Sequence, residues 1–593
     1  MGREDDNVLA SYETLFSKYP GDTMDLQDLR APRLTGNGLK LFAKLLRAPV
    51  VGQSILNKIK RDNRMIQVRE LAATVHTMPL YYPLSTPSTE LYELHATRAQ
   101  NFTIANLVAY NVPETSAPFR HWTIRDYVRR YESGEITPVH VITTVIKAIE
   151  ESNARDIPLR AFIQCHAQAA LTEARESTER YAAKAPLGPL DGVPIAIKDE
   201  IEVRGYETTF GTSFLGSVNG VESEDCLPVA RLRGAGAIIV GKTNMHEFGA
   251  GCFGINIHHG TARNPYNQQY MTGGSSSGSA AAVAAGIVPL AIGCDGGGSI
   301  RIPSGLCGVV GLKATFMRIP YNSNGCPSLS NVGPIAVTVQ DAALAYAIMS
   351  GSDPEHAMSM VQPKVYLSTE PILNDLSHLR IGIFPEYLNG VDQEIITAYN
   401  TQVSYLQSHG ASITNVKIPN LQAIHYAHNM TILTEMAQCT DVHYRRITEF
   451  SADVQINLEL ARSSLSAVEF LAAQRVRSYA LKIMRDMFDT IDIFITPTTA
   501  ILAPYLQDDV FKAGLSQFEL TAGLMKYMIL GNLVGIPGIT VPIGLSKDGL
   551  PISIQLQAAH WNEDTLFQLA RVIEAQCPVA KPAIYYSILD SLA

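Results

Sequence analysis

The segment from Gly273 to Ser304 constrains this chain more than any other part of its sequence. It holds two loops rich in glycine and hydroxyl groups, Gly273–Ser279 and Asp295–Pro303, joined by small and mostly apolar residues. Consecutive glycines leave backbone N–H groups free to converge on an anion. Ser299 follows the second glycine run, so it is well placed as a nucleophile whose oxyanion is held locally. The pattern predicts a catalytic centre, because a structural turn alone does not need two hydroxyl-rich loops.

Short apolar runs alternate with helical segments from Pro189 onward, which defines the fold class. Near-continuous apolar runs are typical of strands buried on both faces of a sheet. Thr137 followed by Pro138 is typical of the start of a helix. We therefore predict an α/β fold in which a large, mixed and twisted β-sheet is sandwiched between α-helices. The runs that predict strands are Pro194–Ile197, Ala237–Val240, Arg380–Ile383 and Ile491–Ile495.

Composition narrows the class of partner and compartment. Only 17% of the 593 residues are charged and 46% are hydrophobic, which suits a large buried core and an oligomer interface. The net charge of −9 disfavours nucleic acid, because phosphate binding needs clustered cations. Two charge-poor stretches, 271–294 and 527–546, are long enough to cross a bilayer. Their glycines, and the prolines of the second, predict buried core instead.

Cysteine spacing and the N-terminus predict an intracellular protein. The eight cysteines form no CxxC pair, so we expect reduced thiols and neither a disulfide framework nor a zinc site. The first six residues are acidic, where a signal peptide would be basic and then apolar. Asp6 replaces the Ser or Thr that follows a myristoylated glycine at this spacing.

A composition shift near residue 118 predicts two regions. Residues 1–118 form an N-terminal helical and loop extension, and residues 119–593 form the main domain. Leu39–Arg47 places apolar residues on one helical face and cations on the other, with Pro49 ending the helix, and Ile55–Arg61 repeats the pattern. The segment 68–118 is predicted to be loop. The helix either packs on the main domain, or it lies on an anionic membrane surface or caps an apolar substrate entrance.

Two familiar motifs are present but lack their structural context. Gly236–Thr243 matches the phosphate-loop pattern, yet its four variable positions form a strand whose amides are used in the sheet. Gly274–Gly278 matches the nucleophile-elbow pattern, yet the loop Asn264–Asn267 precedes it where a strand is required. Nucleotide binding and a Ser-His-Asp hydrolase are therefore both disfavoured.

The long Gly273–Ser304 segment resembles the amidase signature over its whole length. Leu190–Asp199 resembles the lysine motif of the same family, and the similarity extends from about Phe119 to the C-terminus. Shorter segments resemble further landmarks of the family: Gly241–Met245, Thr496–Thr498 and Gly549–Ile552. The leader segments Ala31–Gly36, Lys40–Phe42 and Arg47–Gly52, with Asp295–Ser299 and the ending Lys581–Tyr586, are similar to the plant-type fatty acid amide hydrolases within that family.

By this resemblance, Ser299 is the nucleophile, Ser275 the bridging serine and Lys198 the base. The residues agree with these roles, because a serine hydroxyl needs a base and no histidine is tied to either loop. Burial at the end of an apolar strand is expected to lower the pKa of Lys198 to about 7 to 8, the range useful for a base. An ion pair with Asp199 would oppose this, but adjacent strand residues point to opposite faces.

The residues around this triad also receive expected roles. The oxyanion is expected to be held by the backbone N–H groups of the glycine run, and no metal or organic cofactor is needed. The charged residues that bracket the run are expected to be structural braces, and Gly249 aligns with a channel-wall position in relatives. The resemblance further implies a cis Gly274–Ser275 peptide. The oxyanion residues are Gly296, Gly297, Gly298 and Ser299, and the braces are Asp295 and Arg301.

The leading functional hypothesis is hydrolysis of N-acylethanolamines and similar fatty acid amides to a fatty acid and an amine, through an acyl-enzyme. A small-amide amidase or the A-type subunit of a tRNA-dependent amidotransferase is the alternative enzyme. A catalytically inactive, membrane-associated scaffold is the non-enzyme alternative. We further expect a lipid-like amide substrate, no nucleic-acid partner, a homodimer, and peripheral association with the endoplasmic reticulum or cell membrane without a transmembrane helix.

Overall fold

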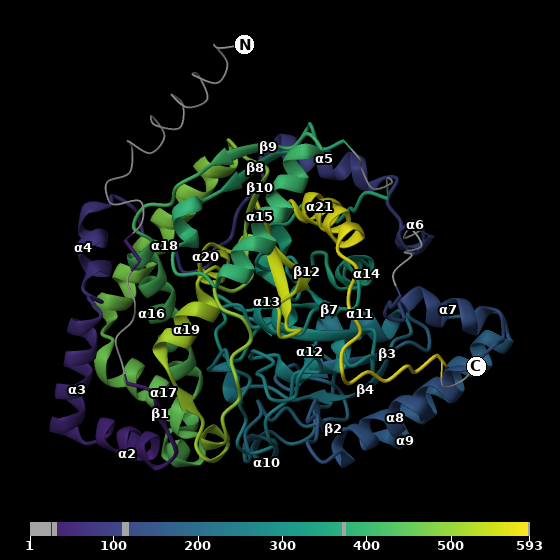
Figure 1. Cartoon of the computed structure of the whole chain (residues 1–593), viewed down its shortest axis with the longest axis horizontal. Coiled ribbons are helices and arrows are strands. Elements are labelled where there is room, and N and C mark those ends of the chain that lie inside the picture. Colours follow the sequence, from purple (N-terminus) through teal and green to yellow (C-terminus); the bar gives the residue numbers. More distant parts are fainter. Residues whose placement is uncertain (1–24, 27–31, 110–117, 370–374, 591–593) are drawn as a thin grey trace, which may run out of the picture.

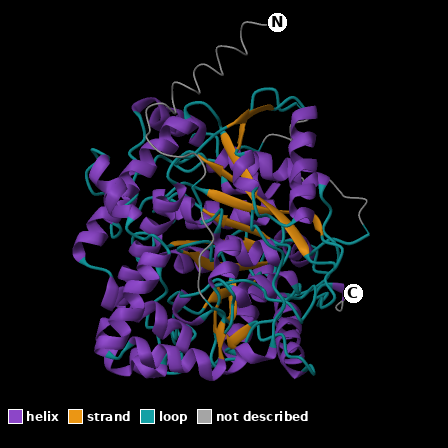
Figure 2. Cartoon of the chain, turned by 60° about the vertical axis from the view of Figure 1, so that its left-hand side comes forward, coloured by secondary structure: helices purple, strands orange, loops and turns teal. Residues whose placement is uncertain are grey.

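Eleven strands form one mixed β-sheet through the centre of the molecule, and helices flank both of its faces (Figures 1 and 2). The computed structural model describes the whole chain except residues 1–24, 27–31, 110–117, 370–374 and 591–593. The expectations about the first six residues therefore lie outside the described residues. The predicted α/β sandwich is confirmed.

The sheet runs from β2 near the bottom of Figure 1 to β9 at its top. β3 lies between β4 and β5 and is parallel to both, so the strand that ends in Lys198 is central and enclosed. All four runs that predicted strands form strands. In spatial order the strands are β2 (Phe162–Gln164), β4 (Ile238–Thr243), β3 (Pro194–Lys198), β5 (Leu290–Asp295), β7 (Asn331–Ala336), β6 (Val310–Lys313), β12 (Gly538–Leu545), β13 (Pro551–Ala558), β10 (Ile493–Pro497), β8 (Arg380–Ile383) and β9 (Ser412–Asn415).

The helices of the main domain cover this sheet and build a helical layer beside it. Thr137 caps the helix that begins at Pro138 by accepting the amide of His140 at 3.3 Å, as predicted. The helices are α7 (Ile124–Glu132), α8 (Pro138–Ala154), α9 (Ala167–Ala182), α10 (Leu215–Asn219), α11 (Leu227–Gly234), α12 (Ser277–Ala284), α13 (Arg301–Leu306), α14 (Val339–Met349), α15 (Gln393–Ser408), α16 (Leu421–Cys439), α17 (Ala452–Ser464), α18 (Ala467–Phe488), α19 (Phe518–Met525), α20 (Ile529–Val534) and α21 (Glu563–Gln576).

In the N-terminal region, α2, α3 and α4 pack against α16, α17 and α18 at the left of Figure 1, α6 packs against α14, and α5 contacts Lys364 and Tyr366. α2 buries Leu39, Ala43 and Leu46 against Ala452 and Ile456. The apolar face of the leader helix therefore packs on the main domain, which was one of the two predicted alternatives. The helices are α2 (Gly36–Leu46), α3 (Pro49–Asp62), α4 (Gln67–Thr74), α5 (Thr89–Ala99) and α6 (Ile104–Ala109), with the two-residue strand β1 (Leu34–Thr35) paired to β11 (Leu515–Ser516).

The helix that Leu39–Arg47 predicts ends before Pro49, as expected, whereas the loop predicted for 68–118 was wrong. Pro49 begins α3, where a proline without an N–H is tolerated, as well as following α2. The segment 68–118 is not loop throughout, because it carries α5, α6 and most of α4. Helices of this length are marginal in water and form here by packing, as α4 does against α18. No helix among the described residues is long and apolar enough to traverse a lipid bilayer.

The charge-poor stretch 271–294 is core, as predicted, and α12 shows why its residues are small. All eight residues of α12 are buried. A Cβ on Gly278 would lie 2.2 Å from the carbonyl oxygen of Ala161 and 2.5 Å from the amide nitrogen of Asn244. Backbone on both sides therefore leaves no room for a side chain.

Gly278→Ala is expected to destabilise the protein by about 1–3 kcal/mol, because the backbone atoms it meets cannot move aside cheaply. The measurement is the thermal unfolding midpoint. Gly234→Ala, at the end of α11, is the matched control, since nothing lies within 4 Å of its added Cβ. An equal midpoint for the two variants would contradict this account of α12.

Candidate active site

Lys198 stands at the carboxyl end of β3 with its side chain fully buried. Its Nζ lies 2.7 Å from the Oγ of Ser275 and 3.2 Å from the carbonyl oxygen of Cys294. The predicted proximity of the lysine and the bridging serine is therefore present in the structure. Because Cys294 contributes its backbone, the identity of that side chain does not alter the contact.

Asp199 points away from Lys198, as strand alternation predicts. Its carboxylate accepts the amide of Gly211 at 2.8 Å and the hydroxyl of Thr209, and it lies 3.9 Å from the Nζ of Lys242. This network occupies the opposite face of the sheet. Lys242 belongs to the false phosphate-loop motif, and its position inside β4 removes that motif as a nucleotide cradle.

A carboxylate that was not expected from the sequence does pair with the lysine. The Oε1 of Glu200 lies 2.7 Å from the Nζ of Lys198, and the Glu200 side chain is only 12% exposed. β3 ends at Lys198 and Glu200 lies in the turn that follows, so strand alternation does not predict the direction of the Glu200 side chain. Burial alone disfavours the ammonium form of the lysine, whereas the structure adds a carboxylate that stabilises it.

Ser275 lies in the loop before α12, and the Gly274–Ser275 peptide is cis, which confirms that prediction. The amide of His246 donates to the carbonyl oxygen of Ser275 at 3.0 Å, while Lys198 contacts its hydroxyl. Ser275 is buried, so both ends of the residue are held by the protein. Its hydroxyl is thus fixed at the inner end of the site.

Ser299 follows the glycine run, in the loop that meets the Ser275 loop. The amide of Ser276 donates to the carbonyl oxygen of Ser299 at 3.2 Å, which ties the two predicted loops together. Ser299 is half-buried and lines a cavity, and among the described residues its hydroxyl has no hydrogen-bond partner. The backbone bond thus joins the loop of Ser299 to the loop of Ser275, and an accessible serine hydroxyl can act as a nucleophile when a base activates it.

The glycine run offers fewer free donors than its length suggests. The amide of Gly298 donates to the Oδ1 of Asp295 at 2.6 Å, so this N–H is already used. In the described part of the chain, the amides of Gly296, Gly297 and Ser299 donate to no protein acceptor. Gly297 and Ser299 line the cavity, which makes their amides the best placed to meet an oxyanion.

Asp295 and Arg301 form the brace that the sequence predicts. The Nε of Arg301 lies 2.9 Å from the Oδ2 of Asp295, and both side chains are fully buried. Asn532 and Gln555 satisfy further donors and acceptors of the pair. Burial opposes ionisation of Asp295, but the Arg301 guanidinium outweighs it and holds the pKa of that carboxyl well below its usual range. Burial, with Arg301 nearby, lowers the pKa of Lys313 to about 7.

A histidine does touch the glycine loop, contrary to the expectation that none is tied to it. The Nε2 of His428 on α16 lies 2.8 Å from the carbonyl oxygen of Gly296, so it donates to that carbonyl. Burial lowers the pKa of His428 to about 4, which keeps the ring neutral. His428 therefore orients the loop backbone and is not placed as a base for Ser299. The long sequence separation of 132 residues hid this contact.

The cavity at Ser299 holds about 1250 Å³, including its open mouth. Gly249 lies in its wall with φ +68°, and a Cβ there would stand 3.6 Å from the Oγ of Ser275. Asn63 and Met65, which follow α3, reach the cavity, so the N-terminal region contributes to its wall. One buried polar pair, His246 and Asp453, also lines it, with Nε2 and Oδ2 3.3 Å apart. Much of the remaining wall is apolar: Ile59, Tyr426, Leu433, Met436, Phe518 and Met525.

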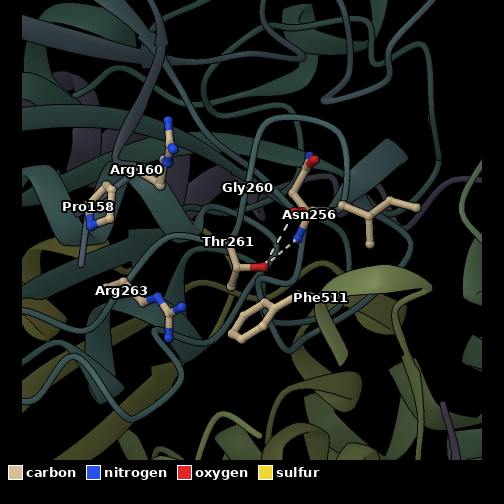
Figure 3. Close-up of a pocket in the computed structure, with 8 residues that line it drawn as sticks. Pro158, Arg160, Asn256, Gly260, Thr261, Arg263 and Phe511 are labelled. Atoms are coloured by element: carbon tan, nitrogen blue, oxygen red, sulfur yellow. Dashed lines mark hydrogen bonds between the residues drawn. The ribbon is translucent and has the colours of Figure 1, made fainter. Parts of the chain in front are cut away.

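A second hollow lies apart from these residues (Figure 3). Its wall includes Arg160 and Arg263, and the guanidinium of Arg263 stands 4.6 Å from the ring centre of Phe511. Asn256 and Thr261 close one side through mutual hydrogen bonds of 3.2 and 3.4 Å. None of the predicted catalytic residues lines it, so the cavity at Ser299 is the candidate active site.

Comparison with known proteins agrees with this geometry. The family profile described as "Amidase" matches residues 140–567. The chain is 35% identical to a fatty acid amide hydrolase of Medicago truncatula, over 96% of this chain and 98% of that protein. It is 32% identical to the A-type subunit of the glutamyl-tRNA(Gln) amidotransferase of Koribacter versatilis, over 75% of this chain and 96% of that protein. The native peptide amidase of Stenotrophomonas maltophilia shares the fold with a TM-score of 0.65 and 25% identity, over 79% and 99% of the two chains.

The chain belongs to the amidase family and is an amide hydrolase. The likeness to the plant protein includes the N-terminal region, whereas the match to the amidotransferase subunit leaves a quarter of this chain uncovered. The N-terminal region, which the match to the plant protein includes, contributes residues to the cavity wall.

Asp295→Asn is expected to destabilise the protein by about 3–5 kcal/mol, because it leaves the buried Arg301 guanidinium without its counter-charge. The thermal unfolding midpoint checks this. Glu449→Gln is the control, since its pair with Arg446 is exposed and little should change. A midpoint for Asp295→Asn close to that of the wild type would show that the pair is not a brace.

Proposed function

We propose that this enzyme hydrolyses long-chain fatty acid amides, including N-acylethanolamines, through a Ser299–Ser275–Lys198 triad and an acyl-enzyme. Three observations carry the proposal together: Lys198 contacts Ser275, the Ser276 amide donates to the carbonyl oxygen of Ser299, and Ser299 lines a mostly apolar cavity. The similarity to a plant fatty acid amide hydrolase over nearly the whole chain supports the substrate class.

The chemistry begins at the lysine. Lys198, when neutral, takes a proton from Ser275, which takes the proton of Ser299 as Ser299 attacks the amide carbonyl. The amides of Gly297 and Ser299 stabilise the oxyanion, with Gly296 and Gly298 shaping the loop. Ser275 then gives a proton to the leaving nitrogen and recovers one from Lys198. This protonation matters because an amide anion is a very poor leaving group. Water then hydrolyses the acyl-enzyme.

The cavity is the feature that favours a long acyl chain over a small amide. Leu433, Met436 and Phe518 are among the apolar side chains of its wall that an acyl chain could contact. Each buried CH₂ contributes about 0.8 kcal/mol, so contact with the apolar wall favours a long chain over an acetyl group. α3, α19 and β11, the strand that pairs with β1, all contribute residues to this wall.

The N-terminal helices offer a surface for peripheral membrane association. Leu41 is 58% exposed and Val50 is 81% exposed, and the cations Lys40 and Lys44 lie on the same helix as Leu41. Exposed apolar side chains interspersed with cations suit the interface of an anionic bilayer. We propose that this surface takes the enzyme to the membrane that holds its lipid substrate. Homodimerisation remains a prediction for size-exclusion chromatography with light scattering.

A fluorophosphonate probe is expected to label Ser299 of the purified protein, because attack by the activated hydroxyl forms a stable adduct. Ser299→Ala should abolish labelling, and Lys198→Ala should reduce its rate by about a hundredfold or more. Ser276→Ala is the control, since Ser276 lies one residue from Ser275 and does not contact Lys198. Full labelling of Ser299→Ala would place the nucleophile elsewhere.

Linoleoyl-ethanolamide is expected to have a kcat/KM at least about a hundredfold above that of acetyl-ethanolamide, because its chain fills the apolar cavity. Leu433→Trp should reduce this ratio by obstructing the cavity while sparing the short substrate. Val442→Trp is the control, because Val442 is exposed to solvent and does not line the cavity. Equal efficiency on both substrates would leave the amidase and remove the lipid assignment.

The amidotransferase alternative makes a different prediction. Such a subunit would depend on partner chains, so the purified protein alone would hydrolyse fatty acid amides poorly. Robust turnover by the isolated chain therefore separates the two. The inactive-scaffold alternative fails if Ser299 is labelled.

A further inference from the structure

We propose that Glu200 is a positioning residue, which holds the Nζ of Lys198 against Ser275 and stabilises the ammonium formed when Lys198 takes a proton. This inference deepens the proposed function and rests on it, because Lys198 must act as the base. It adds a fourth member to the relay, behind the three residues that the sequence predicts.

The backbone brings Glu200 to the lysine by a tight turn. The amide of Ile201 donates to the carbonyl oxygen of Lys198 at 3.0 Å, so the chain reverses directly after β3. Asp199 is anchored to Thr209 and Gly211 on the far side of the turn. The carboxylate of Glu200 is thereby directed back over the end of the strand, where its Oε1 reaches Lys198 at 2.7 Å.

The Lys198 Nζ is held by three acceptors. They are the Ser275 hydroxyl at 2.7 Å, the Cys294 carbonyl at 3.2 Å and the Glu200 carboxylate at 2.7 Å. An ammonium has three N–H donors, so the protonated lysine is fully satisfied in this cage. The neutral amine has two N–H donors and one lone pair, and the lone pair can face the Ser275 hydroxyl. The site therefore suits both states that the relay visits.

Glu200 is the counter-charge that contacts Lys198 directly. Cys294, Cys326 and Tyr321 also interact electrostatically with Glu200. Burial raises the pKa of each far above its usual range, so all three are neutral. Lys198 is fully buried, so no water screens its charge, and a neighbouring carboxylate acts strongly.

Glu200 also lies next to Gly249, which is part of the cavity wall. A Cβ on Gly249 would lie 3.4 Å from its Oε2 and 3.6 Å from the Oγ of Ser275. Gly249 therefore lies in the cavity wall next to both groups, and its φ of +68°, not a lack of space, is what favours glycine there. During acylation the proton passes from Ser275 to Lys198, and during departure of the amine it returns to Ser275.

The role predicts a specific pH dependence. A carboxylate that stabilises the ammonium makes Lys198 a stronger base, but it also favours the ammonium at rest. Because the relay needs the neutral amine, the rate of labelling should rise with pH. Removing the charge should move this rise to lower pH and reduce the limiting rate.

The test is the second-order rate of fluorophosphonate labelling of Ser299 in the full-length protein between about pH 6 and pH 10. Glu200→Gln should move the inflection to lower pH by about one unit or more, and reduce the rate above it by about tenfold. Glu200→Asp, which restores the charge on a shorter side chain, should return the inflection towards that of the wild type while the rate stays low.

Glu202→Gln is the matched control, because it removes the same charge two residues further on, where the carboxylate accepts the side-chain amide of Asn324 at 2.9 Å. It should leave the inflection unchanged. An unshifted inflection in Glu200→Gln, or an equal shift in Glu202→Gln, overturns the inference. Absence of labelling in the wild type would instead refute the proposed function, so the two failures are distinct.

Discussion

Lys198 ends a strand that is enclosed on both sides, and its amine is inaccessible to solvent, so every group that stabilises it must come from the chain. This requirement organises the active site. The serine hydroxyl, the backbone carbonyl of Cys294 and the Glu200 carboxylate all lie within hydrogen-bond distance of one nitrogen. A buried amine without such partners would carry a large desolvation cost.

The second buried charge cluster has a different task. Asp295 and Arg301 bracket the glycine run and neutralise each other in the core, and Asp295 also accepts the amide of Gly298. His428 holds the carbonyl of Gly296 from the opposite side. The loop that presents Ser299 is thus held at three points, which leaves its remaining amides oriented before any substrate arrives. Preorganised donors of this kind stabilise an oxyanion without reorganisation during the reaction.

The N-terminal helices contribute residues to the wall of the cavity that Ser299 lines. α2 is fixed by its apolar face on α17, and residues at the end of α3 and just after it reach the cavity that Ser299 lines. The same helices expose Leu41, Val50 and Val51 to solvent. One surface of this region therefore contributes to the substrate cavity while another is available to a membrane, and the two alternatives for the leader are compatible.

The sequence alone predicted those strands and loops whose conformation depends on neighbouring residues in the chain. The apolar runs predicted β3, β4, β8 and β10, because period and composition define buried strands, and the glycine–serine loops identified Ser275, Ser299 and the brace. Strand alternation correctly turned Asp199 away from Lys198, whereas the turn that brings Glu200 back to the lysine had no counterpart in the strand pattern. The His428 contact with Gly296, the short N-terminal helices and the cavity were decided only by tertiary structure. All three have the same physical cause, because each depends on burial against residues a hundred or more positions away. No local sequence pattern predicts which distant surfaces will pack together.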